Sequence, residues 1–167
     1  MDNLVKIFQE RMDRRRKIRE NKELCLRYPF LIPWNRWSGK SIIDCSGGER
    51  GYWPGDPDTI PDYNFEYTEL DSMPDGWRRA FGLRMCEDLR NALIDDNDLY
   101  RWRIVQLKEK YGELRLYDNG QKIGSTVPMI LERYAQLSMR TCICCGAPAT
   151  RMTTGWISPY CEKCCPD

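Results

Sequence analysis

The feature that most constrains this chain is a set of four cysteines near its C-terminus, spaced as two close pairs. Cys142 and Cys145 form the first pair, Cys161 and Cys164 form the second, and fifteen residues separate the pairs. This C-x2-C-x15-C-x2-C spacing is typical of zinc sites. Two residues between cysteines let one tight turn aim both thiolates at an ion about 2.3 Å away, and Gly146 gives the first turn a permissive backbone. We therefore predict that these four residues hold one Zn²⁺.

The role of this zinc is predicted to be structural. Four protein thiolates complete a tetrahedral shell and leave no position for water or substrate. The intervening segment 147–160 contains Pro148, Gly155, Trp156 and Pro159, which suit a short hairpin that returns the second pair to the first. A unit this small has almost no hydrophobic core, so the metal must supply much of its folding free energy.

The neighbouring cysteines leave a choice of ligands. Cys144 cannot easily share an ion with Cys145, because adjacent side chains diverge, and the same reasoning favours Cys164 over Cys165. The alternatives are an iron–sulfur cluster or a set of reduced, buried thiols. The other three cysteines are predicted to be small core residues: Cys25, Cys45 and Cys86.

Composition places the chain among soluble globular proteins. Hydrophobic residues make up 41% and charged residues 31% of the sequence. No run approaches the roughly 20 apolar residues that cross a bilayer, and the N-terminus passes directly from a short apolar turn into arginines, unlike a signal peptide. We therefore expect a cytoplasmic protein with no membrane partner. In that reducing compartment, nine cysteines point to metal binding rather than to disulfides.

The sequence contains no histidine. This absence excludes the Ser-His-Asp and Cys-His nucleophile pairs, the His-Glu-x-x-His proteases and the His-containing zinc deaminases. An enzyme here would need carboxylates, a lysine, a tyrosine or a thiolate. The best candidate that can be assembled is a carboxylate-based metal nuclease that uses Asp62 or Asp71 with Glu109 and either Lys108 or Lys110. Nothing in the sequence places these residues together, so we predict a non-enzymatic protein.

The N-terminal segment predicts a basic helix from about Asp2, as N-cap, to about Leu26, before Pro29 and Pro33. Its first turns carry an apolar stripe: Leu4, Val5, Ile7, Phe8 and Met12. Cations then wrap most of its circumference: Arg11, Arg14, Arg15, Arg16, Lys17 and Arg19. These six are candidate contacts to a partner or to nucleic-acid phosphates. The alternative is a solvated face that docks on the acidic stretch 56–75 of the same chain.

The middle of the chain has the opposite charge. Residues 51–77 hold seven acids and no base: Asp56, Asp58, Asp62, Glu66, Glu69, Asp71 and Asp75. This stretch either pairs with the basic helix or, by imitating the charge of a nucleic acid, occupies a basic groove on another protein. The segment 33–74 is rich in Pro, Gly and Trp and predicts loops and short strands pinned by Trp34, Trp37 and Trp53.

The remaining patterns predict an α+β core with helices on a small antiparallel sheet. Ser72 has the spacing of a capping residue before a helix with apolar residues every fourth position: Trp77, Phe81, Met85, Leu89 and Leu93. Alternation over 101–108 puts Trp102 and Ile104 on one strand face, with Val105 and Leu107 on the other. Turns at 110–113 and 118–120 complete a two- or three-stranded unit. A helix over about 126–139 follows, with Ile130, Leu131, Tyr134 and Leu137 buried.

We divide the chain into a basic N-terminal helix (1–27), an α+β core (28–140) and a C-terminal zinc-ribbon-like module (141–167). Four segments in this order also resemble a group of small uncharacterised proteins encoded by bacteriophages and prophages: YPFLIPWNRWSGK (28–40), YTELDSMPDGWRRAFGLRMCEDL (67–89), QLKEKYGELRLYDN (106–119) and SMRTCICCGAPATRMTTGWISPYC (138–161). The resemblance implies a C-terminal zinc-binding tail and no established chemistry. It also implies the setting of a bacterial host cell, in which small accessory phage proteins often block host defence.

The sequence thus predicts a non-enzymatic, zinc-stabilised interaction protein that binds and inhibits a host protein. A nuclease or another defence effector is the leading type of target, as for an anti-CRISPR or anti-restriction protein. The alternative is a nucleic-acid-binding zinc-ribbon protein that uses the arginine-rich helix.

Overall fold

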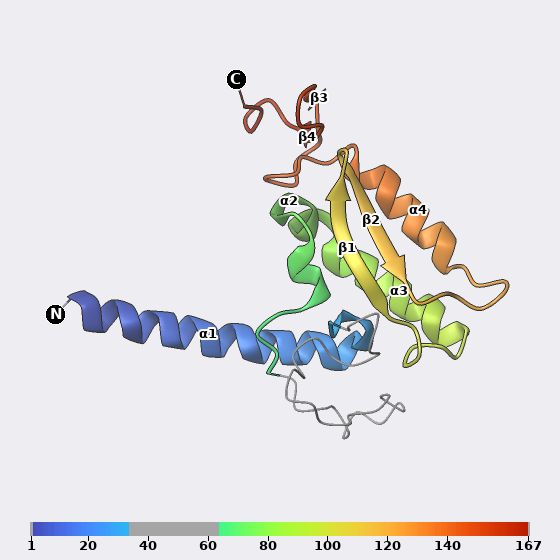
Figure 1. Ribbon diagram of the computed structural model, residues 1–167, viewed down its shortest axis with the longest axis horizontal. Coiled ribbons are helices and arrows are strands. Elements are labelled where there is room, and N and C mark those ends of the chain that lie inside the picture. Colours follow the sequence, from blue (N-terminus) through green and yellow to red (C-terminus); the bar gives the residue numbers. More distant parts are fainter. Residues whose placement is uncertain (1, 34–63, 167) are drawn as a thin grey trace.

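The computed structural model describes residues 2–33 and 64–166 (Figure 1). Residues 34–63 of the predicted tryptophan-pinned segment, including Trp34, Trp37 and Trp53, lie outside the described residues, as do Cys45 and the acids Asp56, Asp58 and Asp62. Within the described residues, a two-stranded antiparallel sheet packs with helices, and a small four-cysteine module follows. The predicted α+β class with a C-terminal metal-binding type of module is therefore confirmed. The boundaries 1–27, 28–140 and 141–167 stay a prediction.

Helix α1 spans Asp2–Arg27, as predicted, because this stretch contains neither glycine nor proline and Pro29 follows it. Its C-terminal end belongs to the body: Cys25 is fully buried beside the short helix η1 (Pro29–Leu31), and Asn21 donates a 2.8 Å hydrogen bond to the Phe65 carbonyl. Its N-terminal half extends away from the body (Figure 1). The predicted apolar stripe is therefore exposed, with Leu4 at 75% and Phe8 at 66%.

The central helical run begins at α2 (Asp75–Trp77), continues through a π-helical turn η4 (Arg78–Gly82) and ends with α3 (Leu83–Asp95). The predicted apolar series is buried throughout: Trp77, Phe81, Met85, Leu89 and Leu93. Residues four apart drift by about 40° per step around an α-helix, since its turn holds 3.6 residues. The wider π turn rotates the series in the opposite sense. It thereby keeps the five side chains closer to one face.

The predicted cap of this run is wrong. Ser72 ends a separate short helix, η3 (Glu69–Ser72), and Pro74 is the N-cap of α2. The capping box lies at η3 instead, where the Thr68 N–H donates a 2.8 Å hydrogen bond to the Asp71 carboxylate. Pro74 explains the shift, because a residue before proline is disfavoured in the helical region, and Met73 is accordingly extended.

Strands β1 (Ile104–Lys110) and β2 (Glu113–Asp118) form the antiparallel hairpin, with Lys110 opposite Glu113. Tyr111 and Gly112 form its turn, both with positive φ. The predicted assignment of strand faces is wrong, because the register shifts between Ile104 and Gln106. This irregularity lets Ile104 and Leu107, three positions apart, both be buried.

Helix α4 (Val127–Ser138) closes the core against α3 and β2 and lies within the predicted range 126–139. Thr126 is its N-cap, and Pro128 lies in its first turn. The Tyr134 ring is buried 5.5 Å from that of Phe81. The predicted Ile130, Leu131 and Leu137 are partly buried against the same core.

Among the described helices, none combines the length and apolarity that a membrane span requires.

Candidate metal centre

Two cysteine turns shape the module that follows α4. In the first, the Gly146 N–H donates a 3.0 Å hydrogen bond to the Cys142 carbonyl, and Gly146 has φ of 83°, a left-handed conformation that favours glycine. In the second, the Cys164 N–H donates a 3.1 Å hydrogen bond to the Cys161 carbonyl. Each turn points two sulfurs to the same side of the backbone, as the two-residue spacing predicted.

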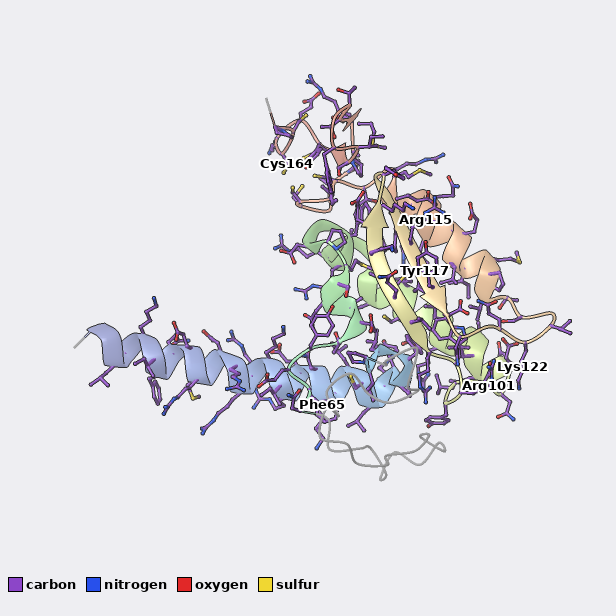
Figure 2. All side chains as sticks on the ribbon, viewed as in Figure 1. Phe65, Arg101, Arg115, Tyr117, Lys122 and Cys164 are labelled. Carbon is purple, nitrogen blue, oxygen red and sulfur yellow. The ribbon has the colours of Figure 1, made fainter. Side chains whose placement is uncertain are left out.

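A short hairpin brings the two turns together, as predicted. Strand β3 (Arg151–Met152) pairs antiparallel with β4 (Pro159–Tyr160). The Ile143 N–H then donates a 2.9 Å hydrogen bond to the Pro159 carbonyl, which joins the first turn to β4. Because the second turn starts at Cys161, directly after β4, it meets the first turn. Figure 2 shows Cys164 in this module, away from the free end of α1.

The four predicted ligands lie together. Their sulfur atoms are all within 4.8 Å of one another, and those of Cys145 and Cys161 are 3.6 Å apart. Sulfurs at the corners of a tetrahedron with 2.3 Å metal–sulfur bonds are about 3.8 Å apart. A disulfide would bring two sulfurs to about 2.05 Å. The spacing therefore fits a single metal ion and excludes a disulfide between Cys145 and Cys161.

The other two cysteines of the module stand outside this group. Burial does not distinguish them, because Cys145 of the cluster is exposed like Cys144, and Cys164 is partly buried like Cys165; the positions of the sulfur atoms do. The cluster is thus the predicted one, with Cys164 rather than Cys165. Cys25 and Cys86, predicted as core residues, are fully buried.

Two thiols of the cluster have pKa values that are shifted in opposite directions. Burial raises the pKa of the Cys142 thiol, but hydrogen bonds from backbone N–H groups of Cys161, Cys145 and Cys144 outweigh it and lower the pKa to about 6. The pKa of Cys164 rises to about 12, because hydrogen bonds with Cys145 and Cys161 keep its proton in place. A thiolate at Cys142 is therefore available near neutral pH. Full ligation must displace the remaining protons, so metal affinity rises with pH.

The module is fixed to the core at Gly76, a contact that the sequence analysis missed. The Gly76 N–H donates a 2.9 Å hydrogen bond to the Ile143 carbonyl, and the indole N–H of buried Trp77 donates a 2.8 Å hydrogen bond to the Thr141 carbonyl. A Cβ atom at Gly76 would lie 2.2 Å from the Cys142 carbonyl oxygen. The first cysteine turn therefore rests directly on the start of α2. The sequence signal for this contact was Gly76 itself, because a glycine is unfavourable in a helix and can mark a place where another backbone comes close.

The cations of α1 divide into two groups. Arg14 pairs with Glu66, and Lys17 lies 3.3 Å from Asp71, so part of the predicted acidic stretch does meet the basic helix. Arg16 pairs within the helix, 2.9 Å from Asp13. Of the six predicted contact residues, three have no carboxylate partner among the described residues: Arg11, Arg15 and Arg19.

The residues weighed for a nuclease are engaged elsewhere. Asp71 lies 3.0 Å from Arg78, and Glu109 accepts a 2.6 Å hydrogen bond from the Gly112 N–H in the hairpin turn. Lys108 donates to Gln106. Within residues 2–33 and 64–166, the cysteine cluster is the only group of three or more potential metal ligands. Asp62 lies outside these residues.

No protein-family model, curated protein sequence or solved structure matches this chain.

Single cysteine substitutions test the ligand set. We expect Cys142→Ser and Cys161→Ser to lose the bound metal and to unfold at lower temperature, because an incomplete shell binds weakly and the module has little core. Cys144→Ser and Cys165→Ser are the matched controls and should keep one equivalent. Elemental analysis of the purified variants measures the metal. Retention of a full equivalent by Cys142→Ser would contradict this ligand set.

A substitution at Gly76 tests how the module is held. Helix propensity alone would make Gly76→Ala stabilising by about 0.5–1 kcal/mol. We expect it instead to lower the free energy of unfolding by about 2 kcal/mol, since its Cβ overlaps the backbone of the first cysteine turn. Gly155→Ala is the control, because open space surrounds Gly155. Denaturant unfolding of both variants measures the difference, and equal stabilities would show that the module does not rest on α2.

Proposed function

We propose that the four-cysteine cluster holds one Zn²⁺ with a structural role. Thiolates are preferred ligands of zinc, and the sulfur spacing fits its tetrahedral shell. With four protein ligands, the ion would have no site left for a reacting molecule. Its work would be to fold the module and to keep the first cysteine turn on α2.

We further propose that the chain is a zinc-stabilised, non-enzymatic protein that binds a protein partner through the free half of α1. The carrying observation is the exposure of Leu4, Val5 and Phe8 on a helix that projects from the body (Figure 1). A helix without an apolar contact gains little stability from its own propensity. Exposed apolar residues gathered on such a helix are typical of a surface that is covered by a partner.

The positions of these residues suit a helix-in-groove contact. Leu4, Phe8 and Met12 follow one another at intervals of four, and Val5 is one turn from Phe8, so all four share one side of α1. Exposed Arg11 and Arg15 lie next to this side and add charge. The expected partner surface is therefore an apolar groove with an acidic rim.

The partner proposed is a host protein, in the setting that the resemblance to phage and prophage proteins implies. Blocking a nuclease or another defence effector is the proposed outcome of that binding, in the cytoplasm of the host cell. Nucleic-acid binding by α1 is the second candidate, because Arg11, Arg15 and Arg19 have no carboxylate partner among the described residues. The first candidate predicts a contact that depends on the apolar residues, and the second predicts one that depends on the arginines.

Affinity capture from a bacterial lysate with and without nuclease separates the two candidates. We expect a partner protein that survives nuclease treatment and is lost with Val5→Ser/Phe8→Ser, because that double variant removes the apolar contact. Ile123→Ser/Met129→Ser is the matched control, since it removes two exposed apolar side chains far from α1 in the sequence. Direct binding of the identified partner to each purified variant then gives the affinities.

Three results would contradict this proposal: no captured protein, capture only of proteins that nuclease releases, or equal capture by both double variants. Release by nuclease together with loss in Arg11→Gln/Arg15→Gln would favour the nucleic-acid candidate.

A further inference from the structure

A second surface lies between the antiparallel helices α3 and α4. It is a groove of about 650 Å³, lined mainly by polar and charged side chains: Arg84, Asp88, Arg133, Tyr134, Gln136, Leu137 and Arg140. Three of these are arginines and one is an acid, so the groove has a net positive charge. The chain as a whole has a formal net charge of only +1. Positive charge is thus concentrated locally in this groove.

Asp88 joins α3 to α4 at the groove, and its carboxylate is already paired there. It accepts hydrogen bonds from the Tyr134 hydroxyl and from Arg133, whose nitrogen lies 2.5 Å away. Burial and the bond to Asp88 raise the pKa of Tyr134, which keeps its hydroxyl neutral. These contacts join α4 to α3, and they leave Asp88 little capacity to neutralise Arg84 and Arg140.

Arg84 and Arg140 also line the groove, and neither has a carboxylate partner among the described residues. The Arg84 guanidinium carbon is 5.9 Å from the centre of the Tyr134 ring, which orients it by a cation–π contact. Arg140 follows α4 and is exposed, with no carboxylate partner among the described residues. A ring that holds one guanidinium in place reduces the entropy that binding a ligand would cost.

A neighbouring groove, between α1 and η4, differs in how its cations are paired. Arg84 borders this groove as well, together with Lys17, Arg78 and Arg79. Lys17 and Arg78 approach the same acid, Asp71, at 3.3 and 3.0 Å. Lys17, Arg78 and Arg79 thus have carboxylate partners. Arg84, which borders both grooves, and Arg140 have none among the described residues.

We propose that the α3–α4 groove binds the phosphodiester backbone of a nucleic acid, with Arg84 and Arg140 each contacting a phosphate. Planar guanidinium groups donate paired hydrogen bonds to phosphate oxygens, which makes arginine the preferred residue for this contact. Arg133 contributes charge while it stays on Asp88. The groove and the free half of α1 involve different residues, so this proposal does not rest on the proposed protein partner.

The position of the groove favours an extended polyanion over a small phosphorylated molecule. Arg140 lies two residues before Cys142, so the groove adjoins the metal module. The module exposes Trp156 to 79%, and an exposed aromatic ring can stack on a base. A chain that crosses the groove can therefore continue over the module.

Fluorescence anisotropy with a labelled single-stranded oligodeoxynucleotide tests the proposal on the full-length, metal-loaded protein. We expect Arg84→Gln/Arg140→Gln to weaken binding about tenfold. It should also reduce the dependence of log K on log salt by roughly 1.4, since each phosphate contact contributes about 0.7 for a single strand. Arg84→Lys/Arg140→Lys keeps the charge and should recover part of the affinity.

Two controls make the outcome specific. Arg27→Gln/Arg115→Gln removes the same charge from arginines that already pair with Glu87 and Glu113, and Arg115 lies on β2 (Figure 2). It should leave the affinity within about twofold of the unmodified protein, because it removes no phosphate contact. Arg11→Gln/Arg15→Gln reports on α1 as a rival site. Metal content and circular dichroism verify that each variant is folded.

Several results would overturn the proposal. These are no binding of the oligonucleotide at low salt, equal loss in the groove variant and the Arg27/Arg115 control, or a loss confined to Arg11→Gln/Arg15→Gln. Displacement of the oligonucleotide by inorganic phosphate at matched ionic strength would point to a small-anion pocket, which also contradicts an extended backbone contact.

Discussion

The contact between the first cysteine turn and the start of α2 links the metal module to the main core, and the order of the module depends on it. The module has few buried apolar side chains of its own, so its order depends on the sulfur cluster and on the surface below it. Gly76 and Trp77 provide that surface through hydrogen bonds to the carbonyls of Ile143 and Thr141. Because Trp77 is also fully buried in the main core, order in the module and order in the core are coupled.

Local sequence patterns predicted the elements well and their junctions poorly. The cysteine spacing identified the sulfur cluster, and apolar periodicity identified the helices that contain Met85 and Tyr134, because both signals depend on residues close together in the chain. The π turn, the irregularity after Ile104 and the start of α2 directly after Pro74 were missed. Each depends on how a helix or strand meets the rest of the core. The role of Gly76 was also missed, since its neighbour is Cys142, far along the chain.

The same limit explains the charged surfaces. The arginine run of α1 is visible in the sequence, but only the fold shows that Arg14 and Lys17 already have acidic partners. The α3–α4 groove has no sequence signature at all, because Arg84 lies on α3 and Arg140 follows α4, far along the chain. Tyr134 of α4 joins the two sides of the groove, since its ring contacts Arg84 and its hydroxyl donates a hydrogen bond to Asp88. The structure thus separates the cations that pair with described carboxylates from those that do not.

X-ray absorption spectroscopy at the zinc edge, on protein purified without added metal, tests most directly whether a closed thiolate shell holds the module. Four sulfur neighbours at about 2.3 Å, with one zinc per chain, is the predicted result. An oxygen neighbour in the first shell would mean an open coordination position and would contradict a purely structural ion. Absence of zinc from folded protein would contradict the role of the metal in ordering the module.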